Sequence, residues 1–174
     1  GELGEIYIND AFSCSHRKQS SIYNITKFVK HSYAGPLLKK EITAIDLVNQ
    51  SKKDPVTCII GGSKVSTKIN VILNLIKNVN NIIIVGAMAN NFLEYKKYEI
   101  GKSLKEENSE NIIKKILVKA ESNKCKILIP VDCLVSKNFK GEAVSKEIKS
   151  VEKDDIILDI GSKTIKIIEE VIDN

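Results

Sequence analysis

The stretch Cys58-Ile-Ile-Gly-Gly-Ser-Lys-Val-Ser-Thr-Lys-Ile-Asn70 runs from an apolar segment through two glycines to two lysines. Residues 56–60 predict a short buried strand, and residues 64–77 predict a helix because their apolar residues recur at helical spacing. In α/β proteins, ligands bind beyond the carboxyl ends of parallel strands, where loops lead into helices. The stretch therefore predicts a parallel crossover with a binding site at its turn.

The residue types at this turn suit an anion. Gly61 and Gly62 let the backbone turn sharply and leave no Cβ in the way of an oxyanion, and Ser63 leads to the predicted helix N-terminus. Lys64 and Lys68 are expected one helical turn apart, where both ammonium groups can face a polyphosphate. The spacing matches neither the Walker pattern nor G-x-G-x-x-G, so a plain turn followed by an exposed lysine face explains it equally well.

Further strands and helices extend this pattern in both directions. Apolar runs predict strands and helical spacing predicts helices, while residues 135–150 are polar and predict a loop or an outer hairpin. The expected strands are residues 5–9, 82–85, 126–129 and 155–159, and the expected helices are residues 37–48, 110–120 and 163–172. Buried strands that alternate with helices indicate an α/β fold, a Rossmann-like parallel sheet with helices on both faces.

Two further places carry residues with binding chemistry. Gly86 and Ala87 follow the strand at 82–85, and small residues there leave space for an adenine, although close packing of a helix on the sheet would need them too. His16 and Arg17 follow the strand at 5–9, and an arginine on a loop can clamp a phosphate or carboxylate, although an ordinary surface arginine fits as well.

Composition excludes several classes of function. The net charge is +5, but the lysines are scattered among 22 acidic residues and aromatics are 5%, which argues against nucleic-acid binding. The four cysteines form no C-x-x-C pair, and Cys14 with His16 is too small a set for a zinc site, so no metal site is expected. No apolar run is long enough to span a membrane and no secretory leader is present, which favours a cytoplasmic protein. The chain begins with Gly1 and enters a strand at once, so we expect a fragment.

Read together, several segments resemble phosphoglycerate kinase. The matches are collinear over essentially the whole chain, which makes them more specific than any single motif. They are residues 8–17 (INDAFSCSHR), 34–41 (AGPLLKKE), 61–69 (GGSKVSTKI), 84–89 (IVGAMA), 99–104 (EIGKSL), 129–132 (IPVD) and 158–161 (LDIG).

The resemblance implies a glycolytic phosphotransferase with two domains that close on a hinge. Residues 1–33 would be the end of the 3-phosphoglycerate-binding domain, residues 34–50 the hinge helix, and residues 51–174 the first half of the nucleotide-binding domain. Such an enzyme moves a phosphoryl group between 1,3-bisphosphoglycerate and ADP, giving 3-phosphoglycerate and ATP, with Mg²⁺ carried by the nucleotide. The intact enzyme is expected to be a monomer.

The resemblance also assigns roles to the site residues. His16 and Arg17 would bind the glycerate substrate, and Lys64 and Lys68 would be catalytic and would contact the nucleotide phosphates. The nucleotide-binding residues would be Gly61, Gly62, Ser63, Lys64, Lys68, Gly86, Ala87 and Gly161. The predicted roles agree with the chemistry, because phosphoryl transfer needs alignment and positive charge around the moving group.

The chain departs from the family pattern in ways that limit this interpretation. Val85 and Ala87 stand where the family has glycine, Thr67 where it has aspartate, and residues 13–15 where it has Gly-Thr-Ala. Segments that complete both substrate sites in the family are missing, so the 174-residue chain should be inactive alone. A truncated relic or a nucleotide-binding module without turnover is the alternative. A nicotinamide-binding domain is disfavoured, since no acidic residue follows a glycine fingerprint at the required distance.

Overall fold

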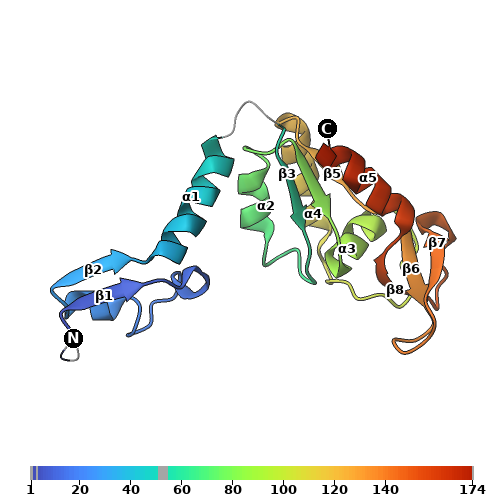
Figure 1. Cartoon of the computed structure of the whole chain (residues 1–174). Helices are drawn as coiled ribbons and strands as arrows, with labels where there is room; N and C mark the ends of the chain where they lie inside the picture. The colour runs from blue at the N-terminus through green and yellow to red at the C-terminus, as the bar shows by residue number, and fades with distance from the viewer. Residues whose placement is uncertain (1, 3, 51–54, 174) are drawn as a thin grey trace. The chain divides into compact units, whose positions relative to one another are not determined.

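The computed structural model describes residue 2, residues 4–50 and residues 55–173, and the chain divides into two compact units (Figure 1). Unit 1 is residues 1–52 and unit 2 is residues 53–174, and each is described by itself. The predicted start of the nucleotide-binding domain at residue 51 falls among residues 51–54, outside the described residues. No helix in the described part of the chain combines the length and apolarity needed to cross a membrane.

Unit 1 is a pair of parallel strands followed by a long helix. β1 (Ile6–Asn9) pairs with β2 (His31–Ala34), and α1 (Pro36–Gln50) follows directly. Two short 3₁₀ helices, η1 (Phe12–Cys14) and η2 (Asn24–Lys27), lie between the strands. The predicted strand at 5–9 and helix at 37–48 are thus confirmed, and β2 lies in a region whose sequence pattern is mixed.

The start of α1 is fixed by the carboxylate of the residue that follows β1. Oδ1 of Asp10 accepts hydrogen bonds from the backbone N–H groups of Leu37 and Leu38, at 2.6 and 3.0 Å. These are two of the N–H groups that a helix leaves without an internal partner. A Cβ on Gly35 would collide with the Asp10 side chain, so glycine is required there.

Unit 2 contains the predicted parallel sheet. Its strand order is β3-β4-β5, and the registers Ile60↔Ile84 and Ile83↔Leu128 place all three carboxyl ends at one edge. The elements are β3 (Thr57–Ile60), α2 (Ile69–Leu75), β4 (Asn81–Ile84), α3 (Ala87–Tyr95), α4 (Glu110–Ser122) and β5 (Lys126–Leu128). The prediction of an α/β fold with a parallel sheet is confirmed.

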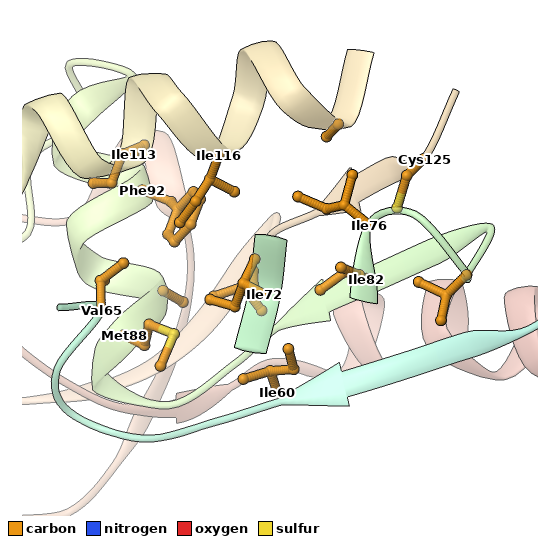
Figure 2. Packing of buried hydrophobic residues seen from close by; sticks show 14 residues of the cluster. Ile60, Val65, Ile72, Ile76, Ile82, Met88, Phe92, Ile113, Ile116 and Cys125 are labelled. Carbon is orange, nitrogen blue, oxygen red and sulfur yellow. The ribbon is translucent and has the colours of Figure 1, made fainter. Parts of the chain in front are cut away.

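The core of unit 2 lies between this sheet and helices α2, α3 and α4. Figure 2 shows Ile72 of α2 beside Ile82 of β4, with Phe92 of α3 and Ile116 of α4 above them and Ile60 of β3 below. All of these side chains except Ile60 are at most 1% exposed. Burial of such side chains is worth about 1.5–3 kcal/mol each, so this cluster is the main source of the unit's stability.

A second sheet in unit 2 is antiparallel. Its order is β7-β6-β8, formed by β6 (Asp132–Ser136), β7 (Val144–Glu147) and β8 (Ile156–Ile160). The short η3 (Ile148–Ser150) follows β7, and α5 (Ser162–Asp173) follows β8 and packs on β6. The polar stretch 135–150 therefore contains a hairpin. The predicted strand at 155–159 exists, but it pairs antiparallel with β6 instead of extending the parallel sheet.

Candidate functional site

Two glycine loops meet at the carboxyl ends of β3 and β4. The carbonyl oxygen of Gly62 accepts a hydrogen bond from the backbone N–H of Met88, at 2.7 Å. Both Gly62, with φ of 143°, and Gly86, with φ of 65°, have backbone angles that other residues rarely adopt. A Cβ on Gly86 would lie 3.4 Å from the backbone nitrogen of Gly62, so the two loops are in direct contact.

The helix after the first loop begins later than predicted. Residues 64–77 were expected to be helical, whereas α2 spans only Ile69–Leu75. Lys68 occupies the N-cap position, and residues 66–68 form a turn in which the Lys68 N–H bonds to the Val65 carbonyl at 3.0 Å. The prediction that Lys64 and Lys68 share a helix face is therefore wrong. The Thr67 hydroxyl bonds locally to the Lys64 carbonyl and the Ser66 hydroxyl bonds to Glu106 in a distant segment, and both bonds hold these residues outside the helix, which explains the shift.

Both lysines nevertheless flank the first glycine loop. A Cβ added to Gly62 would lie 2.9 Å from Cε and 3.8 Å from Nζ of Lys68, so this side chain runs beside the bare backbone of the loop. Lys64 is exposed and precedes Val65, whose side chain is fully buried in the core (Figure 2). The arrangement supplies two ammonium groups and glycine backbone at one edge of the sheet.

A carboxylate from a distant segment holds this loop. Oε2 of Glu106 accepts a hydrogen bond from the backbone N–H of Ser66 at 3.0 Å, and Oε1 accepts one from the Ser66 hydroxyl. The hydrogen bonds from Ser66 hold the pKa of Glu106 below its usual value, with a smaller contribution from the charge of Lys64. Glu106 was not identified from the sequence.

A cavity of about 290 Å³ opens beside the second glycine loop. It is lined mostly by apolar side chains, and two of the predicted nucleotide-binding residues, Gly86 and Ala87, are among its walls. The other lining residues are Ala89, Asn90, Leu93, Leu104, Pro130, Cys133, Phe139, Ile148, Ile157, Leu158, Asp159 and Ile160. Phe139 is 78% exposed, as expected of an aromatic ring at the mouth of a cavity. An apolar cavity next to a lysine-flanked loop suits a ligand with a flat apolar end and an anionic end.

Gly161 is placed by a buried aspartate. The Asp132 carboxylate accepts hydrogen bonds from the backbone N–H groups of Lys163 at 2.9 Å and Thr164 at 2.8 Å, and from the Thr164 hydroxyl at 2.6 Å. Burial alone would raise the pKa of Asp132, but these hydrogen bonds outweigh it and lower the pKa. A Cβ on Gly161 would collide with this carboxylate, so packing requires glycine here, while the three residues before it line the cavity.

His16 and Arg17 lie in unit 1, just after η1. The backbone N–H of Arg17 bonds to the carbonyl of Cys14 at 3.0 Å, and both side chains are exposed. The structure brings together Gly61, Gly62, Lys68, Gly86 and Ala87 within unit 2. The positions of these residues relative to His16 and Arg17, which belong to unit 1, are not described.

Carboxylates that could share a cation occur at one place in the described residues. Ligand oxygens of Glu152, Asp154 and Asp155 lie within 4.8 Å of one another. The ammonium group of Lys137 lies 2.6–2.9 Å from oxygens of all three, and that of Lys146 lies 2.8 and 3.2 Å from Asp155 and Glu152. Two lysines thus already offset most of the charge of the three carboxylates, so the cluster is an ion-pair network and a poor site for a metal.

The family model of phosphoglycerate kinase matches residues 1–174 of this chain. Curated relatives with this description include the protein of Wolbachia pipientis wMel, 43% identical over 171 residues, and that of Francisella tularensis subsp. tularensis (strain WY96-3418), 39% identical over 172 residues. These alignments cover 98% of this chain but only 43% and 44% of the relatives. The chain therefore spans less than half the length of the relatives it matches.

Solved structures give the same result. The chain is similar to the structure of phosphoglycerate kinase from Coxiella burnetii, with a TM-score of 0.86 and 34% sequence identity. It is also similar to the phosphoglycerate kinase of Pyrococcus horikoshii OT3, with a TM-score of 0.76 and 27% identity. Each alignment covers 98% of this chain and 44% of the solved one.

Proposed function

Because this chain belongs to the phosphoglycerate kinase family, we propose that it forms part of an enzyme that transfers a phosphoryl group between 1,3-bisphosphoglycerate and ADP. The products are 3-phosphoglycerate and ATP, and the reaction is a step of glycolysis. The observation that carries the proposal is the contact between two glycine loops, with Lys68 on one side and an apolar cavity on the other.

In this proposal, unit 2 binds the nucleotide. The base enters the cavity bordered by Gly86 and Ala87, and the phosphates extend toward Gly61, Gly62 and Ser63. Lys64 and Lys68 offset the negative charge of the phosphates and of the moving phosphoryl group, which is the main requirement of this chemistry. The Ala87 methyl group narrows the cavity relative to the family's glycine, and Gly161, which directly follows three residues of the cavity wall, completes the proposed set of nucleotide-binding residues.

The Mg²⁺ ion is proposed to arrive with the nucleotide phosphates. The described carboxylate cluster at Glu152, Asp154 and Asp155 is already paired with lysines, and none of its members lines the cavity. When bound, the ion would neutralise charge on the phosphates. The lysines of this chain would do the same from the protein side.

Unit 1 is proposed to bind the glycerate substrate through His16 and Arg17. Arginine can bind a phosphate or a carboxylate with two parallel hydrogen bonds, and both side chains are exposed. The intact enzyme is proposed to be a cytoplasmic monomer with no nucleic-acid or membrane partner.

A second candidate is nucleotide binding without turnover. It is favoured by the share of the relatives that this chain spans, about 43%. Under this alternative, the loops and cavity of unit 2 retain affinity for ADP, but the chain alone transfers no phosphoryl group.

Calorimetric titration of the chain with Mg²⁺-ADP tests both candidates. We expect saturable binding that weakens about tenfold in Lys68→Met, which corresponds to about 1.4 kcal/mol. Lys166→Met, on the exposed face of α5, is the matched control and should bind as the wild type does. Equal binding by the two variants, or no wild-type binding at millimolar ADP, would refute the nucleotide site. A coupled assay for ATP then separates the candidates, because turnover by the chain alone rules out the second.

A further inference from the structure

The segment between α3 and α4 touches both parts of the candidate nucleotide site. Leu104 is part of the wall of the apolar cavity, and Glu106, two residues later, reaches Ser66 in the lysine-bearing loop. Through Leu104 and Glu106, this segment therefore links the cavity proposed for the base with the loop proposed for the phosphates. The segment has no helix or strand of its own between residues 103 and 109.

Two buried asparagines of α3 hold this segment in place. Asn90 and Asn91 are 2% and 1% exposed. The amide nitrogen of Asn90 donates to the Leu104 carbonyl at 2.9 Å, and Oδ1 of Asn91 accepts from the backbone N–H of Glu106 at 2.8 Å. The Ser109 hydroxyl also donates to Oδ1 of Asn91, at 3.3 Å. Because buried polar groups with partners are costly to disrupt, the main chain of Glu106 has a rigid support.

The Glu106 side chain extends from this support to the turn that precedes α2. Ser66 lies between Val65, whose side chain is fixed in the core, and Thr67 and Lys68, which belong to the turn. Its backbone N–H and its hydroxyl both donate to the Glu106 carboxylate, so both carboxylate oxygens are occupied. An anionic group occupied in this way is unsuited to contact a phosphate. It can only act through the loop that it holds.

We propose that Glu106 is a positioning residue for the nucleotide site, supported by Asn91 and acting on Ser66 to set where Lys64 and Lys68 stand. The inference rests on the proposed nucleotide-binding function of unit 2. Without this hold, residues 66–68 would keep the Val65 anchor but lose the acceptor that fixes the turn. The lysines would then occupy the binding geometry for a smaller fraction of the time, and apparent affinity falls by that fraction.

The test combines amide hydrogen exchange with ADP binding on the 174-residue chain. In Glu106→Ala the backbone contact to Asn91 is retained, so the global urea midpoint should stay near that of the wild type. Exchange at Ser66 and its neighbours should become about tenfold faster without nucleotide, and Mg²⁺-ADP should bind about 3- to 10-fold more weakly. Glu106→Gln keeps one acceptor for the Ser66 N–H and should restore part of both effects.

The matched control is Glu107→Ala, which removes the same charge from the neighbouring, more exposed position. It should change neither exchange at Ser66 nor ADP affinity. Wild-type ADP binding with unchanged exchange and affinity in Glu106→Ala would overturn the positioning role while leaving the proposed function intact. A wild-type chain that binds no ADP would refute the proposed function and, with it, this role. Equal effects in Glu106→Ala and Glu107→Ala would reduce the role to a general charge effect and also overturn it.

Discussion

Unit 1 and unit 2 each begin a helix with an aspartate that caps its first N–H groups. In unit 1, Asp10, the residue after β1, accepts hydrogen bonds from the first N–H groups of α1, and Gly35 leaves space for its carboxylate. In unit 2, Asp132 at the start of β6 does the same for α5, with Gly161 in the corresponding place. The two aspartates differ in burial, since Asp132 is 3% exposed and Asp10 is more accessible.

The two units differ in how much apolar surface is buried around this aspartate cap. Among residues 4–47 of unit 1, only Gly35 and Leu38 are buried. Unit 2 contains two clusters of buried apolar side chains. An aspartate cap therefore fixes the direction of a helix, whereas stability comes from the apolar surface that the helix buries.

Truncation of an apolar helix side chain should show the largest difference in stability between the two units. Ile72 of α2 is fully buried, so Ile72→Ala should lower the free energy of unfolding of unit 2 by about 2–5 kcal/mol through lost burial and a cavity. Ile45 of α1 is 44% exposed, and Ile45→Ala should change stability by less than about 0.5 kcal/mol. Urea unfolding followed by circular dichroism measures both. Similar shifts for the two variants would contradict the assignment of stability to the unit 2 core.

Replacing each aspartate by asparagine should give a smaller but still unequal effect. Asp132 uses both oxygens, one for Lys163 and one for Thr164, so Asp132→Asn turns one acceptor into a donor facing an N–H. We expect a loss of about 1–3 kcal/mol.

Asp10 uses a single oxygen for both of its bonds, and Asp10→Asn can keep that oxygen, so we expect a change of a few tenths of a kcal/mol at most. Urea midpoints and amide exchange at the first turns of α1 and α5 measure the pair. A larger loss of stability in Asp10→Asn than in Asp132→Asn would contradict the claim that only Asp132 needs both of its oxygens.

A further difference is a pH dependence found in unit 2, which appears only in acid. Burial alone would raise the pKa of Asp155, but hydrogen bonds from Lys146, the Glu152 backbone and Lys137 outweigh it and hold the pKa well below its usual range. A carboxyl with a lowered pKa stabilises the fold fully above its unfolded value of about 4, and this contribution is lost as the pH falls further.

We therefore expect Asp155 to add a slope of at most about 1.4 kcal/mol per pH unit below pH 4. Asp155→Asn should flatten that part of the profile, and Asp173→Asn, at the exposed end of α5, should leave it unchanged. Urea midpoints measured from pH 6 to pH 3 check this. An unchanged slope in Asp155→Asn would place the acid sensitivity elsewhere.

The parallel sheet could be predicted from the sequence because its strands are short apolar runs between amphipathic helices. The predicted strands at 56–60, 82–85 and 126–129 differ from β3, β4 and β5 by at most one residue at each end. The direction of β8 could not be predicted, because a buried antiparallel strand has the same apolar composition as a parallel one. The late start of α2 was missed because Ser66 and Thr67 bond outside the helix.

The candidate site was predictable only in part. The glycines and lysines after β3 stand together in the sequence, and their chemistry can be read there. Glu106 is 40 residues away from Ser66 in the chain, and the cavity wall gathers residues from the loop after β4 to β8, so only the folded chain brings them together. The roles of His16, Arg17 and Gly161 in substrate binding came from family resemblance and stay predictions.

The bond between Asp132 and Thr164 also has a consequence for the order of events during synthesis. The two residues are 32 positions apart, so at ribosomal rates of about 5–20 residues per second Thr164 follows Asp132 by a few seconds. Throughout that interval β6 carries a charged carboxylate that its own hairpin with β7 does not satisfy. The carboxylate is therefore left to water until α5 emerges, and docking of α5 supplies its hydrogen-bond donors.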